Sequence, residues 1–536
     1  MNRSFMNKLL VACLGTAILA MPLANRAFAL EPWVVGTGTS KIYIQNIDPS
    51  GTATYAASFY GQTTTGSPDL TINGSLVYQG NVIYDVSTVG GGALPSGWTG
   101  SVVVSSDRQI AAIAKTIYTG NQFGGYTNGS PDGKTDQAYS AFLSSSQALY
   151  FPYVTQAITT SLANKRFSVV TIQNTTSGNA PIYFQYRSTV TGNIEVIKTD
   201  TIPGYRAKSY DLGDPSSANF PGYFSTPAWN GSLVVTSTVG IVGAVGSFWQ
   251  DTSGVAGQLY GGWSSAYTAA TSPDTTLYAP NVFRRIINPD PNPILGEWSQ
   301  WSNLFIQNTS AITAHITVSY TATGSSVPSY TVPITIPGYQ ARELNTRFGG
   351  TSNYPAPADF LTNLGNMFAG SVVIKSDQPI VGVVHSFWGS FFNAGSSANL
   401  VGSAGIARTW YVPYAPRSCS VNPCPSASTL SGWLNWSKVA IMNVSGGPVN
   451  VTAQYVNANG TPQGVAFTLN SLQNGSVDAF NTRFGSDSGA VTASQMDSAL
   501  GATFEGGAVI SATGNIVVTV IQQMPEDIEN WNAIHP

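Results

Sequence analysis

The chain has 536 residues and a formal net charge of −3 at pH 7, and only 9% of its residues are charged. A globular protein usually has about 25% charged residues, so the polar surface here must come mainly from Gly, Ser, Thr, Asn and Tyr. The slightly acidic balance excludes the concentrated basic face that nucleic-acid binding requires. We therefore expect no nucleic-acid partner.

The first 29 residues have the pattern of a secretory signal peptide. A basic start is followed by an apolar stretch over residues 9–23 and by Ala-Phe-Ala at 27–29, a typical cleavage site. We expect residues 1–29 to be removed, which leaves a secreted or cell-surface protein that begins at Leu30 with a net charge of −6. A lipoprotein signal acylated at Cys13 is the alternative. No later apolar run has the length of a membrane span, so no transmembrane segment is expected.

A strand-like phrase that ends in Gln-Asn or Met-Asn occurs four times after the signal. The copies occupy residues 41–46, 169–174, 303–308 and 438–443, and their Asn residues are separated by 128, 134 and 135 positions. Such a period exceeds the roughly 20–50 residues of solenoid and propeller units and matches a small domain. The sequence therefore predicts four related domains in tandem.

Short strands are expected on both sides of this phrase in each copy. Upstream, an aromatic-x-Pro segment predicts an edge strand, because Pro cannot donate a hydrogen bond to a neighbouring strand. Downstream, an alternating segment that ends in Tyr has the period of a half-buried strand. The upstream segments are 149–154, 277–282 and 410–414, with a remnant at 31–35 in the first copy, and the downstream segments are 182–186, 315–320 and 450–455.

The end of each copy is predicted to be a β-hairpin. The clearest example is 370–384, where Ser-Asp-Gln-Pro forms the expected turn between two strands rich in Val and Ile. Asp107 and Asp377 both fall in this turn, where we expect their side chains to bond their own backbone. The Pro-Gly pairs at 203–204 and 337–338 predict type II turns with Gly at positive φ.

About seven short strands per copy, with frequent Gly, Pro and Asn and no helical period, predict an all-β chain of immunoglobulin-like antiparallel β-sandwiches. Short helical turns are expected only at 357–367 and 492–500. Segments rich in Gly, Ser and Tyr separate the copies; they could be flexible linkers, but their aromatic residues favour packing on a neighbour. The predicted sandwiches are 30–118, 148–250, 277–389 and 410–536, and the segments between them are 119–147, 251–276 and 390–409.

Few residues of this chain could support catalysis. His315, His385 and His535 do not recur between copies, and the Glu residues fall at unrelated positions. A metal site, a catalytic triad or a pair of glycosidase carboxylates would need partners that this pattern does not supply. We expect a non-catalytic protein without a cofactor. The acidic loop at 132–136 could bind calcium, although it lacks the spacing of an EF-hand.

Two kinds of residue remain as candidate site residues. Cys419 and Cys424 lie close together in a loop rich in Pro and Ser, which predicts a local disulfide in an oxidising compartment. Six Trp residues flank the segments between copies, where they could seal domain junctions or stack on sugar rings, and junction packing is favoured. They are Trp249, Trp298, Trp301, Trp388, Trp433 and Trp436.

The combination of aromatic-x-Pro, Ile-Gln-Asn, Ile-Pro-Gly and Ser-Val-Val-x-x-Ser-Asp-x-Pro-Ile-Val resembles a known group of repeat modules. These modules occur in exported, largely uncharacterised surface proteins of filamentous green non-sulfur bacteria. The resemblance covers nearly all of residues 31–523, although the first copy lacks the Ile-Pro-Gly turn and the fourth has Leu-Gln-Asn-Gly at 472–475. It implies an envelope location and a structural or adhesive role, and it transfers no catalytic residue.

Two functions are expected on these grounds. The first is a secreted structural protein of the bacterial cell surface, which assembles with copies of itself into an S-layer-like envelope layer, a sheath or a filament. The alternative is an adhesin that binds cell-surface glycans through the Trp- and Tyr-rich loops between repeats. The sequence leaves open whether the domains form a straight rod or a folded-back array.

Overall fold

The computed structural model describes residues 23–24, 37–62, 67–119, 135–142, 144–158, 164–215, 217–251, 261–292, 294–389, 394–524 and 528–535. The predicted all-β fold is confirmed, because these residues form antiparallel sheets that pack as four sandwich-like modules. Only two residues of the expected signal peptide are described. They form β1 (Leu23–Ala24), which pairs with β6.

Each module contains seven or more strands, and their order repeats along the chain. The first module comprises β2 (Thr37–Asn46), β3 (Ala53–Gly61), β4 (Leu70–Leu76), β5 (Asn81–Asp85), α2 (Val89–Gly92), β6 (Gly100–Ser106), β7 (Ile110–Thr119) and β8 (Thr135–Ser140). The second comprises β9 (Ser146–Ala157), β10 (Asn164–Asn174), β11 (Ala180–Ser188), β12 (Ile194–Ile202), β13 (Ala207–Asp211), β14 (Trp229–Asp251) and β15 (Gly261–Thr268).

The last two modules add a short helix each, in the two segments where helical turns were predicted. The third comprises β16 (Asp274–Pro289), β17 (Gly296–Asn308), β18 (Ala314–Ala322), β19 (Tyr330–Ile336), β20 (Ala341–Asn345), β21 (Gly349–Gly350), η1 (Thr351–Asn353), α3 (Pro357–Leu364), β22 (Met367–Trp388), β23 (Ala394–Asn399), β24 (Val401–Gly402) and η2 (Ser403–Gly405). The fourth comprises β25 (Ala407–Val412), β26 (Arg417–Cys419), β27 (Trp433–Asn443), β28 (Val449–Val456), β29 (Phe467–Leu472), β30 (Val477–Asn481), β31 (Gly485–Ser486), α4 (Ala493–Leu500), β32 (Thr503–Phe504), β33 (Gly507–Gln523) and β34 (Ile528–Asn532).

The prediction of a closing hairpin is wrong. The first half of β22 pairs with β16 and β18, whereas its second half pairs with β17 and β23. The Ser-Asp-Gln-Pro segment therefore carries one long strand from the first sheet of the sandwich to the second. In the first module the two halves are the separate strands β6 and β7, which pair with β3 and β2 respectively.

The side chains of the two Asp residues of this crossing contact their own backbone, as predicted, and they also bond a neighbouring strand. Asp107 Oδ1 accepts a hydrogen bond from the backbone N–H of Thr54 at 2.7 Å, and Asp377 Oδ1 accepts one from His315 at 2.8 Å. Both donors lie at the start of the strand that pairs with the first half of the crossing. Their recurrence therefore has a structural reason.

The Asn that ends each repeated phrase makes the same three hydrogen bonds in every module. In the third module, Asn308 Nδ2 donates to the carbonyls of Ile312 at 2.7 Å and Ile336 at 3.0 Å, while its Oδ1 accepts from Ser310 N at 2.9 Å. The side chain thus joins the loop after the strand to the strand that returns beside it. All four Asn residues are fully buried, and the others are Asn46, Asn174 and Asn443.

The Pro-Gly turn places its positive φ on the following Tyr, not on Gly. Tyr205 has φ 59° and Tyr339 has φ 61°. Gly204 is needed for a different reason, because a Cβ atom there would lie 2.1 Å from the carbonyl oxygen of Ser177. The close approach of two backbone segments explains why a glycine stands at this position.

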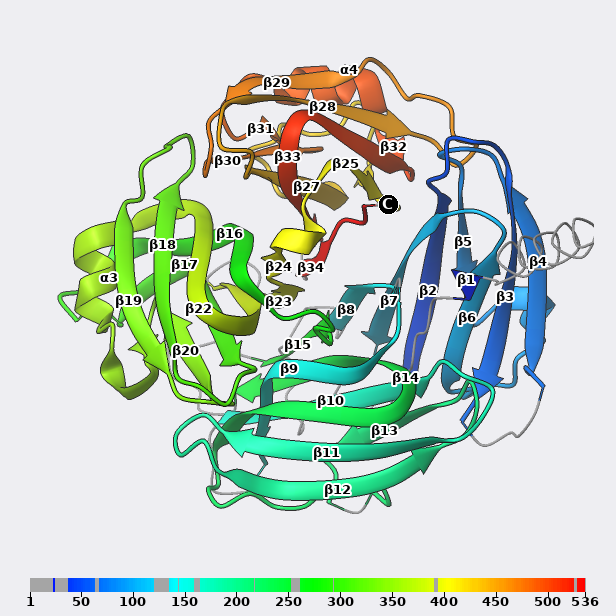
Figure 1. Cartoon of the computed structure of the whole chain (residues 1–536). Helices are drawn as coiled ribbons and strands as arrows, with labels where there is room; N and C mark the ends of the chain where they lie inside the picture. The colour runs from blue at the N-terminus through cyan, green and yellow to red at the C-terminus, as the bar shows by residue number, and fades with distance from the viewer. Residues whose placement is uncertain are drawn as a thin grey trace, which may run out of the picture.

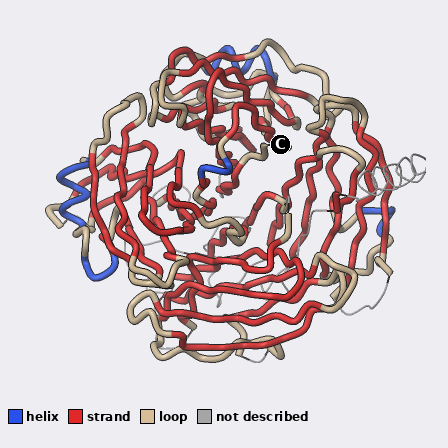
Figure 2. The backbone as a smooth tube through the Cα atoms, viewed as in Figure 1, coloured by secondary structure: helices blue, strands red, loops and turns tan. Residues whose placement is uncertain are grey.

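The four modules lie around a common centre (Figure 1). One strand of each module, β8, β15, β23 or β34, occupies this centre and packs against the corresponding strands of the two adjacent modules. Side chains link successive strands there: Asn399 Nδ2 donates to Thr268 O at 2.9 Å, Asn532 Nδ2 to Asn399 O at 3.1 Å, and Ser140 Oγ to Asn532 O. Figure 2 shows that α3 and α4 lie at the outer rim. The modules therefore form a ring, and β8, β15 and β23 lie in the segments between copies, where packing on a neighbour was favoured over a flexible linker.

The ring is closed by contact between the first and the last module. The backbone N–H of Asn81 donates to the carbonyl of Ala458 at 2.9 Å. Tyr43 and Ile113 of the first module also belong to the apolar core of the fourth module. At the other junctions Ser101 Oγ donates to Tyr205 O at 3.1 Å, and Ser371 Oγ donates to Gly475 O at 2.7 Å. Each module thus uses comparable surfaces to hold the next one.

Candidate functional site

The Trp residues singled out in the sequence lie inside the protein. Trp298, Trp301, Trp388, Trp433 and Trp436 are each exposed by 4% or less, and Trp249 is half-buried. Stacking of a sugar ring needs an exposed aromatic face, and these five side chains do not offer one. Trp249 and Trp388 lie at junctions: Trp249 packs on Phe387 of the third module, and Trp388 packs with Ile521 and Ile528 of the fourth.

The other four Trp residues form two equivalent stacks with buried Arg side chains. In the fourth module the guanidinium of Arg483 lies 5.2 Å from the ring centre of Trp433 and 4.6 Å from that of Trp436, while Arg417 lies 4.7 Å from Trp433. In the third module Arg347 contacts both Trp298 and Trp301, and Arg284 contacts Trp298. Burial lowers the pKa of Arg284, Arg347 and Arg483 to about 10. These cations remain charged at neutral pH and stabilise the stacks.

A sequence motif marks these stacks, and its recurrence was the signal that sequence reasoning missed. Asn-Thr-Arg-Phe-Gly occurs at 345–349 and again at 481–485. The Arg of each copy stacks on the Trp pair, and the Thr hydroxyl donates to a backbone carbonyl, at 2.7 Å for Thr346 and 3.0 Å for Thr482. The following Phe348 and Phe484 are 51% and 49% exposed.

Replacing Trp433 with Ala is expected to lower the free energy of unfolding of the fourth module by about 3–5 kcal/mol, because a fully buried ring and its cation contacts are lost. Tyr223→Ala is the matched control, since Tyr223 is a large aromatic residue that is 67% exposed. Urea unfolding measures both variants. An equal, small effect of the two substitutions would show that Trp433 is exposed in solution.

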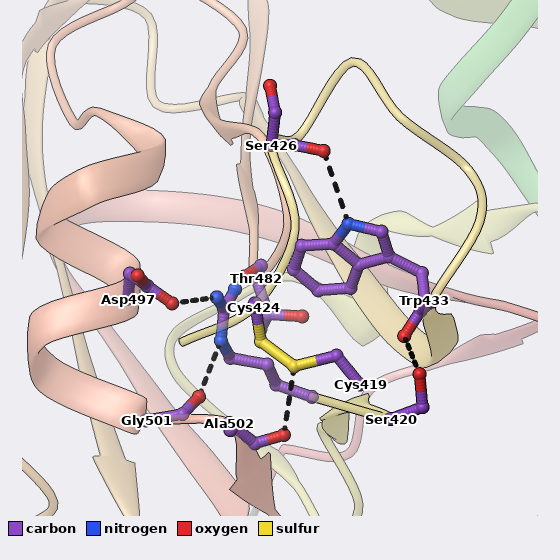
Figure 3. The surroundings of a disulfide bond; sticks show 11 residues. Cys419, Ser420, Cys424, Ser426, Trp433, Thr482, Asp497, Gly501 and Ala502 are labelled. Carbon is purple, nitrogen blue, oxygen red and sulfur yellow. Dashed lines mark hydrogen bonds and ion pairs between the residues drawn. A yellow bond between two sulfur atoms is a disulfide. The ribbon is translucent and has the colours of Figure 1, made fainter. Parts of the chain in front are cut away.

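The predicted disulfide is present and supports the loop that covers the Trp stack. Cys419 and Cys424 are bonded, and they pack with Trp433 and Trp436 in one apolar cluster. Figure 3 shows Trp433 beside the disulfide, with its ring nitrogen directed at the carbonyl of Ser426, at 3.4 Å. Arg417 ties this region to α4, through its hydrogen bonds to Asp497 and to the carbonyl of Gly501. The cluster is structural in all its contacts.

At two of the four junctions, the aromatic residue that follows the Pro of one module contacts an aromatic ring of another module. Tyr153, which follows the Pro of the second module, stacks on Phe305 of the third at 4.0 Å between ring centres. Tyr414, at the same position of the fourth module, contacts Tyr43 of the first in a tilted arrangement, with 4.2 Å between ring centres. Between the third and fourth modules the corresponding contact is polar, because Asn281 Nδ2 donates to Thr519 Oγ1 at 2.9 Å.

His385 lies in the aromatic junction between the second and third modules. It is 1% exposed and lies 4.9 Å from Tyr153, 5.6 Å from Trp249 and 5.4 Å from Phe305, measured between ring centres. Neither ring nitrogen has a hydrogen-bond partner among the described residues. Burial away from water lowers the pKa of this imidazole from its usual 6.5 to about 3. The side chain is therefore neutral in the folded protein.

Acidification is expected to destabilise the junction through His385. Above pH 6.5 the imidazole is neutral in both states, whereas below it the unfolded chain gains a proton that the folded chain does not, until about pH 3. The free energy of unfolding should fall by about 1.4 kcal/mol per pH unit in this window from this residue alone. His385→Phe should remove that contribution. Unfolding of both proteins at pH 7 and pH 5 measures it; an unchanged pH dependence would contradict the buried neutral state.

The described residues contain no group of three or more His, Cys, Asp or Glu placed to hold a metal ion. His315 pairs with Asp377 at 2.8 Å in an exposed position, and the loop at 132–136 considered for calcium has its side chains outside the described part of the chain. Two grooves among the described residues have volumes of about 590 Å³, between β29 and α4, and about 620 Å³, beside α3. The first has no charged lining residue and the second has Arg285 and Asp487. Neither brings together a catalytic set.

No family model matches this chain, and no curated protein matches it. Among solved structures, the Anabaena sensory rhodopsin transducer aligns with a TM-score of 0.16 and 18% identity, over 21% of this chain and 95% of that one. A Thermotoga maritima protein, 1070, aligns with a TM-score of 0.15 and 14% identity, over 19% of this chain and 81% of that one. None of the helices in the described residues is long and apolar enough to cross a membrane.

Proposed function

We propose that this chain is a secreted, non-catalytic structural protein of the bacterial cell surface, which associates with copies of itself into a layer, sheath or filament. The proposal rests on the contacts that the buried Arg, Trp, Asn and His side chains make. Among the residues that the structure describes, the buried Arg, Trp, Asn and His side chains named above hold modules and junctions together, and none of them lines the two grooves described above. In such a chain the buried polar side chains stabilise the fold.

The closed ring limits how copies can associate. The surface by which each module holds the next is already occupied, and the fourth module covers the surface of the first. Head-to-tail addition through these junctions is therefore blocked, and assembly must use the outer rim or the two faces of the ring. Phe348 and Phe484 are the best candidates there, because both are half-exposed, apolar and held in place by the Arg beneath them.

Electron microscopy of the purified chain from Leu30 tests this proposal. At high protein concentration we expect ordered sheets or fibres, and we expect the double variant Phe348→Asp, Phe484→Asp to reduce them. Val190→Asp is the control, because Val190 is apolar and 82% exposed but lies in a different module. A wild-type protein that stays strictly monomeric at all concentrations, with and without calcium, would contradict self-assembly.

A further inference from the structure

A buried polar cluster lies at the junction that closes the ring. Lys115 comes from β7 of the first module, whereas Glu529, Gln522 and Asn435 come from β34, β33 and β27 of the fourth. Lys115, Gln522 and Glu529 are exposed by only 4%, 0% and 2%. Two of these groups are charged, one is a carboxamide, and all are shielded from water.

The distances arrange an amine, an amide and a carboxylate around one another. Lys115 Nζ lies 3.2 Å from Glu529 Oε2. The neighbours of Gln522 orient its amide, whose oxygen lies 3.1 Å from Lys115 Nζ and 2.9 Å from Asn435 Nδ2, while its nitrogen lies 3.1 Å from Glu529 Oε2. Glu529 therefore contacts both the amine and the amide nitrogen, and Asn435 donates to the amide oxygen.

Two aromatic rings lie beside the cluster. The rings of Tyr43 and Tyr414 contact each other beside it, and Asn435 Nδ2 also lies 3.3 Å from the hydroxyl of Tyr414. Trp436, which is 1% exposed, adjoins Asn435 in the chain. Because Lys115 Nζ lies 3.2 Å from Glu529 Oε2, this carboxylate can accept the proton that the amine must lose before it attacks a carbonyl carbon. A neutral amine is a nucleophile.

We propose that Lys115 and Gln522 join in an amide cross-link that closes the ring covalently. The lone pair of Lys115 Nζ attacks Cδ of Gln522, and Asn435 Nδ2 stabilises the negative charge that develops on the amide oxygen. Glu529 takes a proton from Nζ and delivers a proton to the amide nitrogen of Gln522. The Cδ–Nε2 bond breaks, ammonia leaves, and the new Nζ–Cδ amide remains. The reaction needs no oxidant, metal or second protein.

The position of the cluster explains why a cross-link belongs there. The first three junctions are joined by the chain itself, whereas the first and fourth modules are joined only by contacts. The residues equivalent to Lys115 in the other modules, by strand register, are Gly246, His385 and Ile521. No amine stands at any of those three positions. The four residues of the proposed reaction therefore lie at the junction that lacks a peptide connection.

Intact-mass spectrometry of the purified full-length protein, incubated at pH 8, tests the proposal. We expect the wild type to lack the mass of one ammonia, and a protease digest to contain a branched peptide that joins Lys115 to Gln522. Lys115→Arg keeps the positive charge and the ion pair but removes the reactive amine, and Glu529→Gln removes the proton carrier. Both variants should retain the full mass. Lys438→Met, which removes a Lys paired with Asp487 at 2.7 Å, should still form the link.

Three results would overturn the proposal. The first is a wild-type mass equal to that of the unmodified chain, with the peptides around positions 115 and 522 recovered separately. The second is an equal loss of ammonia in Lys115→Arg, which would place the loss elsewhere, for example at an Asn-Gly sequence. The third is a loss of water that joins Lys115 to Glu529 instead. Circular dichroism shows whether each variant is folded. A folded Lys115→Arg protein with the full mass therefore supports the cross-link.

Discussion

Replacing Asn308 with Ala is expected to lower the free energy of unfolding of the third module by about 3 kcal/mol or more. The substitution leaves the buried carbonyl of Ile336, and the partly buried carbonyl of Ile312 and N–H of Ser310, without their partner. The loss at a buried group costs about 1–3 kcal/mol. Asn308→Asp should be similarly damaging at neutral pH, because a carboxylate would face two carbonyl oxygens. Urea unfolding and hydrogen exchange of β17 and β18 measure the effect.

Asn73→Ala is the matched control, because Asn73 is exposed on β4 and the change there should stay within about 0.5 kcal/mol. The same loss is expected at Asn46, Asn174 and Asn443, since each makes the same bonds. An Asn308→Ala protein as stable as Asn73→Ala would contradict the structural role of the repeated Asn.

Asp211→Asn is expected to stabilise the second module, with an effect that grows with pH. Burial raises the pKa of Asp211 from 3.8 to about 7, so the folded chain keeps a proton that the unfolded chain releases. Stability is therefore lost as pH rises from 3.8 to about 7, and Asn removes this loss. The gain should reach about 4 kcal/mol above pH 7 and vanish below pH 3.8.

The chain itself offers the precedent for this substitution. Asn345 and Asn481 occupy the equivalent positions of the third and fourth modules, where their Oδ1 atoms accept two backbone N–H bonds each. Asp85 is the equivalent of Asp211 in the first module and is only half-buried, so Asp85→Asn should change stability little. Thermal unfolding from pH 4 to pH 8 separates the two variants. A pH-independent effect of Asp211→Asn would show that Asp211 is ionised in the folded protein.

The sequence predicted what depends on local pattern. Alternating residues and turn residues indicate strands, and the recurrence of one buried Asn per copy revealed the four modules. The sequence did not distinguish a hairpin from a crossing strand, because 370–384 has the same Val- and Ile-rich pattern whether its halves pair with each other or with other strands. Likewise, the sequence predicted a positive φ at Gly204. Glycine is needed there because the backbone of Ser177, which is distant in the chain, comes close to it.

The sequence predicted even less of the candidate site, because the exposure of a side chain depends on contacts between residues that are far apart in the chain. Trp433 and Trp436 could have been surface residues, but Arg417 from β26 and Arg483 from the turn after β30 pack against them. The ring follows from side chains such as Tyr153 and Tyr414, which meet residues of the next module more than a hundred positions away or at the other end of the chain. No spacing rule in one sequence indicates such pairings.

Small-angle X-ray scattering of the chain from Leu30, at low concentration, tests ring closure most directly. A closed ring should give a radius of gyration near the value of about 24 Å that a compact chain of this length has, and a maximum dimension well below that of four modules in line. A markedly larger radius with the profile of an elongated rod would contradict the contact between the first and fourth modules. The Lys115–Gln522 link would then have no junction in which to form.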